Sequence, residues 1–134
     1  MIRLLDNSAL RYEKQKKIDR ASLEAVNRIV ILKGLFLQAG FSLVQLALET
    51  GIPRNALSHL INSQAGHNFN EYINLMRIRH FKEKALTSEW DGFTVKMMAK
   101  ASGFSCRTTS YRTFKRHLGL GPEEYLKAIK EGQE

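Results

Sequence analysis

Cysteine is nearly absent from this sequence of 134 residues, which contains only Cys106. A single thiol cannot form an internal disulfide, so nothing points to an oxidising compartment. Long apolar runs are lacking too: the longest, residues 29–37, is interrupted by Lys33 and is far shorter than the ~20 residues of a membrane span. Arg3 and Asp6 interrupt the only apolar start, so no signal peptide is predicted. We therefore expect a cytoplasmic protein without membrane insertion.

The residue combinations that catalysis and metal binding require are also lacking. The sequence shows no paired carboxylates, no nucleophile with a base, and no glycine-rich phosphate loop. None of its four histidines has zinc-type spacing, and the lone cysteine adds no ligand set. We therefore expect no enzyme, no cofactor and no metal, and we expect Cys106 to pack as a small residue near the start of a helix.

Strand signals are scarce, whereas helical spacing is common. There is no sustained alternation of β-branched residues. Apolar residues instead recur every three to four positions over residues 23–37 and 72–81. Pro53 and Pro122 each follow a glycine closely and separate helices. The pattern predicts an all-α fold of about seven helices.

The charge has one dominant sign. Subtracting 13 acidic from 21 basic residues gives +8, with a pI near 9.8, which favours a polyanionic partner. Residues 96–118 contain six Lys and Arg and no Asp or Glu, and residues 50–70 also lack acids. Such stretches suit a groove lined by phosphates, because a carboxylate there would repel the DNA backbone.

The sequence repeats itself with an offset of 52 residues. Residues 46–53 and 98–105 share the order apolar-Ala-x-x-x-Gly-apolar. Gly51 and Gly103 can adopt positive φ and end a helix there, before a second helix begins. Each unit therefore predicts a helix-turn-helix, whose second helix enters the major groove of DNA.

The second helix of each unit carries a polar stripe with helical spacing. Arg can bind guanine, Asn can bind adenine, and Ser and Thr can bind either. The predicted base-reading residues are Arg54, Asn55, Ser58, His59 and Asn62 in the first unit, and Arg107, Thr108, Thr109 and Arg112 in the second. The predicted phosphate contacts are Lys115, Arg116 and the helix N-termini near Ser42 and Thr94.

The second unit resembles the DNA-binding domain of the AraC/XylS family. The resemblance rests on Gly103-Phe104-Ser105 before a basic helix ending in Phe114-Lys115-Arg116, followed by Gly119-x-x-Pro122-x-x-Tyr125, and it extends over about residues 41–128. It implies two homeodomain-like helix-turn-helix subdomains joined by a long helix, which read successive major-groove segments on one face of the DNA. The positions that match the family's base contacts are Asn55, Ser58 and His59, and Arg107, Thr108, Thr109 and Arg112.

One departure from the family concerns Ser110, which stands where the family usually has an apolar core residue. This position leaves two alternatives: a loosened second helix, or transfer of the packing role to Tyr111.

The resemblance predicts four segments. These are a basic N-terminal segment or linker over residues 1–21, a first subdomain over 22–69, a connecting helix over 70–87 and a second subdomain over 88–134. The family usually adds an effector-binding or dimerisation domain, so the chain is expected to be either a fragment of a longer regulator or a small stand-alone member.

The predicted partner is double-stranded DNA, bound sequence-specifically by a transcriptional regulator. RNA polymerase is a further candidate partner. The chain alone is expected to be a monomer, whereas an upstream domain would allow a dimer. The alternative is a basic helical module that binds an acidic protein or a membrane surface. It is less favoured because no helix opposes a strong Trp/Phe/Leu face to a Lys/Arg face.

Overall fold

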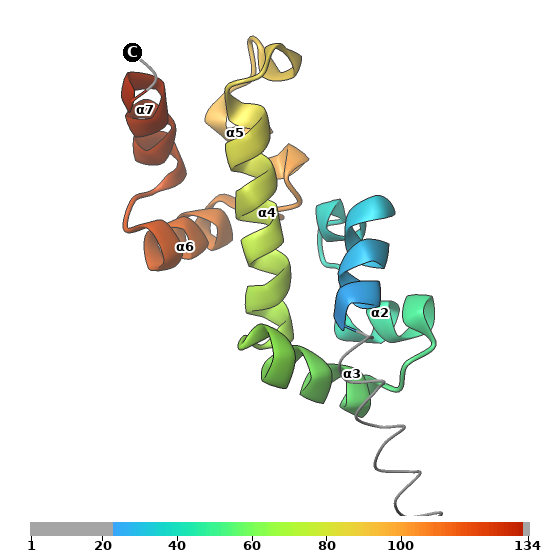
Figure 1. The fold of residues 1–134 in the computed structure, drawn as a ribbon. Helices are drawn as coiled ribbons and strands as arrows, with labels where there is room; N and C mark the ends of the chain where they lie inside the picture. Colours follow the sequence, from blue (N-terminus) through green and yellow to red (C-terminus); the bar gives the residue numbers. More distant parts are fainter. Residues whose placement is uncertain (1–22, 133–134) are drawn as a thin grey trace, which may run out of the picture. The chain divides into compact units, whose positions relative to one another are not determined.

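The computed structural model describes residues 23–132, and these residues contain helices and no strand (Figure 1). The predicted all-α fold is therefore confirmed, while the predicted basic segment 1–21 lies outside the described residues. Residues 23–32 are helical. The elements that follow are η1 (Leu35–Leu37), α2 (Leu43–Thr50), α3 (Arg54–Leu60), η2 (Ile61–Ala65), α4 (Phe69–Ala85), η3 (Ser88–Trp90), α5 (Val95–Ala101), α6 (Arg107–Leu118) and α7 (Pro122–Gly132).

The described chain divides into two compact units. The first contains residues 23–33 and 42–69, and the second contains residues 34–41 and 70–132. The division falls at residue 69, and both residues 34–41 and α4 from residue 70 onward belong to the second unit. The four segments predicted from the sequence stay a prediction.

The first unit is built around the α2–α3 helix-turn-helix. Ser42 and Gln45 form a capping box at the start of α2, in which the Ser42 hydroxyl accepts from the Gln45 N–H at 3.2 Å. Gly51, at φ 73°, ends α2, and its N–H donates to the Ala47 carbonyl at 2.9 Å. The fully buried side chains of this unit are Val26, Val30, Leu46, Leu57, Leu60 and Ile61.

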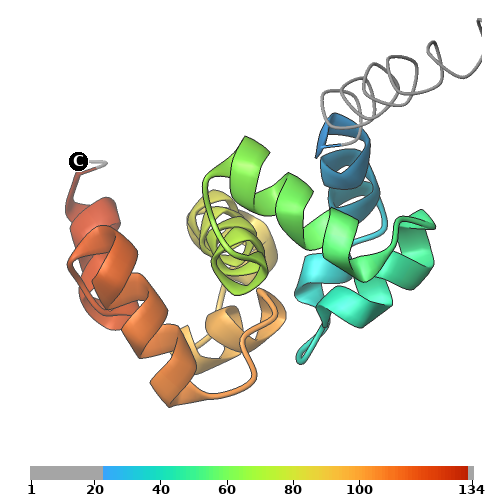
Figure 2. The same ribbon diagram turned by 90° about the horizontal axis from the view of Figure 1, so that it is seen from below.

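The second unit packs its helices around α4, which Figure 2 shows nearly end-on. The rings of Phe81 in α4 and Phe114 in α6 meet edge to face with centroids 4.8 Å apart. Trp90 of η3 adds a second edge-on contact with Phe81. The buried cluster comprises Ile78, Phe81, Ala85, Trp90, Met98, Ala99, Phe104, Phe114 and Leu126. Helices α4 to α7 therefore share one core, which holds α6 rigidly.

The buried Arg77 of α4 fixes the turn between α5 and α6. Its Nε donates to the Phe36 carbonyl at 2.7 Å, and a terminal nitrogen donates to the Gln38 carbonyl at 3.0 Å. Gly103 packs against this cluster at φ 102°, and a Cβ there would run into the Phe36 carbonyl oxygen and lie 2.8 Å from the Arg77 Nε. Only glycine fits this position, because both its backbone conformation and its surroundings exclude a side chain.

Ser110 keeps the core position that the sequence left uncertain. Its side chain is 3% exposed and its hydroxyl donates to the Arg107 carbonyl at 2.9 Å, whereas Tyr111 is 47% exposed. Transfer of the packing role to Tyr111 is therefore wrong. The hydroxyl is tolerated in the core because the preceding helical turn supplies its acceptor.

Candidate nucleic-acid interface

Helix α6 has one buried face and one exposed face. It buries Ser110, Thr113 and Phe114 against the second unit. The residues predicted to read bases are all exposed: Arg107, Thr108, Thr109 and Arg112. At 100° per residue, Thr108 and Arg112 lie farthest from the buried face, and Lys115 continues their line. The local sequence thus builds a single outward surface of hydroxyls and cations.

Positive charge increases toward the end of α6. The last turn carries Lys115, Arg116 and His117, and no acid occurs between Arg107 and Leu118. Cations in this position complement the negative end of the helix dipole and can also neutralise phosphates.

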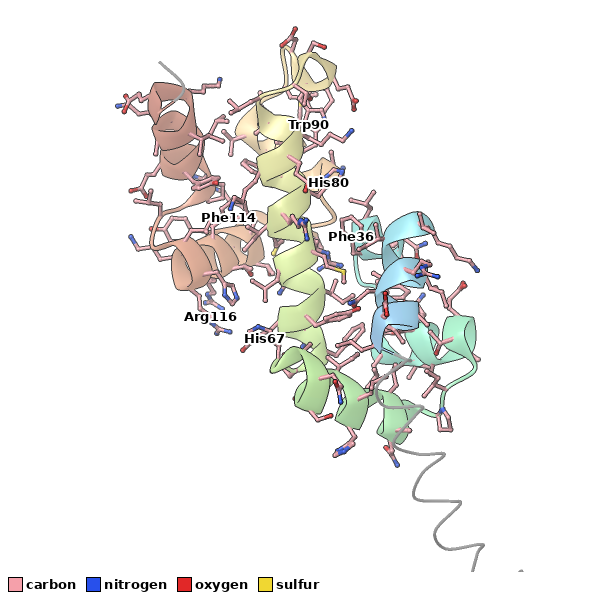
Figure 3. The ribbon with its side chains drawn as sticks, viewed as in Figure 1. Phe36, His67, His80, Trp90, Phe114 and Arg116 are labelled. Atoms are coloured by element: carbon pink, nitrogen blue, oxygen red, sulfur yellow. The ribbon has the colours of Figure 1, made fainter. Side chains whose placement is uncertain are left out.

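The surface is not free of acids in three dimensions, because the fold brings one carboxylate to it. A terminal nitrogen of Arg116 lies 3.5 Å from the Glu71 Oε1, and Figure 3 shows Arg116 pointing from α6 toward α4. Glu71 belongs to the first turn of α4 and is distant in sequence from the acid-free stretch 96–118 that contains α6. Sequence reasoning missed this contact because the two residues are 45 positions apart.

Helix α3 presents a smaller and less charged surface. Arg54, Asn55 and His59 are exposed and Ser58 is half-buried, opposite the buried Leu57 of the core. Arg54 is the only permanently charged residue of α3. Its outward face therefore consists mainly of side chains that can form hydrogen bonds, with a single permanent cation.

Asn62 departs from the regular spacing that predicted its role. Helix α3 ends at Leu60, and Asn62 lies in the π-helical turn η2. Its Nδ2 donates to the Ser58 carbonyl at 2.9 Å. The spacing that placed Asn62 on the stripe assumes a continuous α-helix, and a π turn has a wider i→i+5 repeat.

The two predicted helix N-termini carry side-chain caps. The Ser42 hydroxyl accepts from the Gln45 N–H, and the Thr94 hydroxyl accepts from the Met97 N–H at 3.1 Å. These bonds explain why serine and threonine begin α2 and α5. A contact of either N-terminus with phosphate stays a prediction.

Cys106 lies at the N-cap of α6 and is exposed. The prediction that it lies near the start of this helix is confirmed, whereas the prediction that it packs there as a small residue is wrong, because its side chain is exposed. Its Sγ lies 3.1 Å from the Thr109 Oγ1, and this side-chain hydrogen bond, with a further one to the Thr109 backbone, lowers the pKa of the thiol.

Residues 23–132 lack two further features. No group of three or more His, Cys, Asp or Glu side chains there could hold a metal ion. No helix of this part of the chain is long and apolar enough to cross a membrane.

Known structures share this fold. A protein of unknown function from Listeria innocua is 28% identical, with a TM-score of 0.62 over 76% of this chain and 93% of its own. The DNA-binding domain of AdpA, solved in complex with a target DNA, is 21% identical with a TM-score of 0.65 over 79% and 93% of the two chains. A DNA-binding transcriptional dual regulator from Escherichia coli is 15% identical with a TM-score of 0.64 over 79% and 92%. No curated protein matches the chain.

A family model supplies the assignment that structural likeness alone does not. The model of a helix-turn-helix domain of the AraC type matches residues 46–128, which include most of α2, helices α3 to α6 and most of α7. The chain therefore belongs to the AraC/XylS family of sequence-specific DNA-binding transcription regulators.

Proposed function

We propose that α3 and α6 are the recognition helices and that each enters the major groove of one segment of a double-stranded operator. The observation that carries this proposal is the two-sidedness of α6. Its inner face is held by the core through Phe114, while its outer face presents Arg112, Thr108 and Lys115 with no acid in the helix. Such a face matches the acceptor-rich groove edge and its phosphate walls.

The base-reading roles follow from the side-chain chemistry. Arg112 can bind the O6 and N7 of a guanine, and the side chains beside it are Arg107 at the start of the helix and the hydroxyls of Thr108 and Thr109. In α3, Asn55 suits an adenine, which accepts and donates at neighbouring atoms. The other proposed base-reading residues of that unit are Arg54, Ser58, His59 and, at the margin, Asn62.

The phosphate contacts are proposed at the edges of these helices. Lys115 and Arg116 supply cations from the last turn of α6. The first turns of α2 and α5, capped by Ser42 and Thr94, supply backbone N–H donors. Contacts of this kind set the register of the protein on DNA without reading its sequence.

Three alanine variants distinguish base reading from phosphate binding. A cognate duplex is first selected from a random pool. Arg112→Ala is then expected to lose about 1–3 kcal/mol on that duplex and little on random DNA, whereas Lys115→Ala weakens both and flattens the log–log salt slope by about one unit. Lys127→Ala, an exposed lysine of α7, is the matched control and leaves both unchanged.

The proposal is overturned if Arg112→Ala weakens cognate and random duplexes equally. That result would place Arg112 among the phosphate contacts and remove α6 from the reading of sequence. Binding with no sequence preference at all would instead favour a general basic module.

A further inference from the structure

Glu71, the carboxylate that lies beside Arg116 of α6, points to a control on DNA binding by a residue outside the proposed DNA contacts. Lys115 and Arg116 are neighbours in the last turn of α6, and both are exposed cations. Only Arg116, of these two, has a recorded ion pair in the described structure, at 3.5 Å to Glu71. The two cations are thus a natural matched pair, one with a carboxylate partner and one without.

Their positions on the helix explain this difference. With 100° between successive residues, Lys115 lies near the centre of the outward face of α6, and Arg116 lies on its flank. That flank turns toward the first turn of α4 (Figure 3). Glu71 is well placed there, because a carboxylate in the first turn of a helix is stabilised by the helix dipole. The Glu71 side chain is 31% exposed, so it is held more closely by the protein than the Arg116 side chain, which is 68% exposed.

We propose that Glu71 competes with the DNA phosphates for the guanidinium of Arg116, and so determines how much Arg116 contributes to DNA binding. This inference rests on the proposed role of α6 in binding DNA. An exposed ion pair is weak, so Glu71 does not prevent Arg116 from binding DNA. It lowers the binding free energy that Arg116 gains from a phosphate contact. Because phosphate contacts carry no sequence information, Glu71 sets the affinity for DNA of any sequence.

The exchange of partners makes this competition measurable. A cation that binds a phosphate releases a condensed counterion, which gives about 0.9 units of salt slope whether or not that cation had a carboxylate partner. Arg116 must leave Glu71 to bind a phosphate, so the affinity that it contributes is reduced by the strength of that ion pair. In the presence of Glu71, Arg116 therefore contributes less affinity than it does when the carboxylate is removed.

A double-mutant cycle tests the proposal by titrating duplex DNA over a range of salt concentrations. Glu71→Gln is expected to raise affinity for cognate and random duplexes alike, by about 1.5- to fivefold at low salt. Lys115→Ala is expected to flatten the slope by about 0.9 units in the natural background. Arg116→Ala is expected to weaken binding by a smaller factor in the natural background than in the Glu71→Gln background, the two factors differing by about 1.5- to fivefold at low salt.

Glu83→Gln is the control, because Glu83 is an exposed acid of the same helix and is also paired, with Arg79 at 3.1 Å. It is expected to leave both affinity and slope unchanged. Thermal unfolding of each variant shows that the comparison is made between folded proteins.

The outcomes separate the two proposals. The role of Glu71 is overturned if Arg116→Ala weakens binding by the same factor with Glu71 present and in the Glu71→Gln background, or if Glu83→Gln has the same effect as Glu71→Gln. A slope that Lys115→Ala does not change would instead overturn the role of α6 in DNA binding.

Discussion

Gly51 and Gly103 occupy equivalent places in the two repeats, between the first and second helix of each unit, yet their surroundings differ. Gly51 has φ 73° and open space where a Cβ would stand. Gly103 has φ 102°, and its Cβ position is filled by the Phe36 carbonyl and the Arg77 side chain. Backbone conformation alone requires glycine in the first unit, whereas packing requires it as well in the second.

The proposed recognition helices of the two units also differ, in length and in charge. Helix α3 has seven residues, one Arg and a π-helical continuation, whereas α6 has twelve residues with four Lys and Arg. The first unit therefore offers hydrogen-bonding groups on a short helix. The second offers charge on a longer helix held by an aromatic core. We therefore propose that α6 supplies most of the electrostatic attraction to DNA.

The largest expected effect contrasts the two glycines. Gly103→Ala is expected to cost about 2–5 kcal/mol of unfolding free energy, because left-handed strain adds to the overpacking. Gly51→Ala carries only the strain and should cost about 1–2 kcal/mol. Urea unfolding measures both values. Equal costs would show that the Arg77 cluster does not constrain the turn.

The second prediction contrasts the two helices on DNA. Asn55→Ala is expected to lose about 1–3 kcal/mol on the cognate duplex, the value of a good bidentate contact, with no change in salt slope. Arg54→Ala is expected to leave the slope unchanged, because Arg54 is a proposed base-reading residue, and a slope flatter by about one unit would place it among the phosphate contacts instead. Fluorescence anisotropy over a salt series measures each. A flatter slope for Asn55→Ala would contradict the assignment, because a neutral side chain releases no counterion.

The smallest expected effect concerns pH and the second unit alone. His80 lies between Phe36 and Trp90 (Figure 3), and its Nδ1 is 3.1 Å from the Ser102 hydroxyl. Burial, with Lys84 as a lesser cause, lowers the pKa of His80 below its usual 6.5. The unfolded chain therefore binds a proton first as pH falls from 7 to 5, and stability decreases over that interval.

This pH effect should be small, because the imidazole is partly solvated and solvent screens its interactions. Melting temperatures at pH 7 and pH 5 measure it. His80→Gln should remove most of the difference, and an unchanged difference would assign the pH dependence to other groups.

Much of the fold could be predicted because local signals agree with it. The repeated Ala and Gly spacing located both turns, and the helical recurrence of apolar residues located α4 and the core. The exposed faces of α3 and α6 also follow from helical periodicity, since Leu57 and Phe114 fix the buried side of each helix.

The remaining features depend on contacts that periodicity does not encode. Arg77 is buried because distant backbone carbonyls accept its hydrogen bonds. Glu71 reaches Arg116 only through the packing of α4 beside α6. The π turn that displaces Asn62 looks like regular helix in sequence. Each of these depends on three-dimensional context that the local sequence does not specify.

Selection of preferred sites from a random duplex pool tests the central claim most directly when it is repeated with Asn55→Ala and Arg112→Ala. The account predicts that each variant relaxes the base preference at its own position, and that these positions lie in two different segments of the selected site. The assignment of α3 and α6 as two separate readers of DNA would be contradicted if both variants relaxed the preference at the same positions, or if neither variant relaxed it at any position.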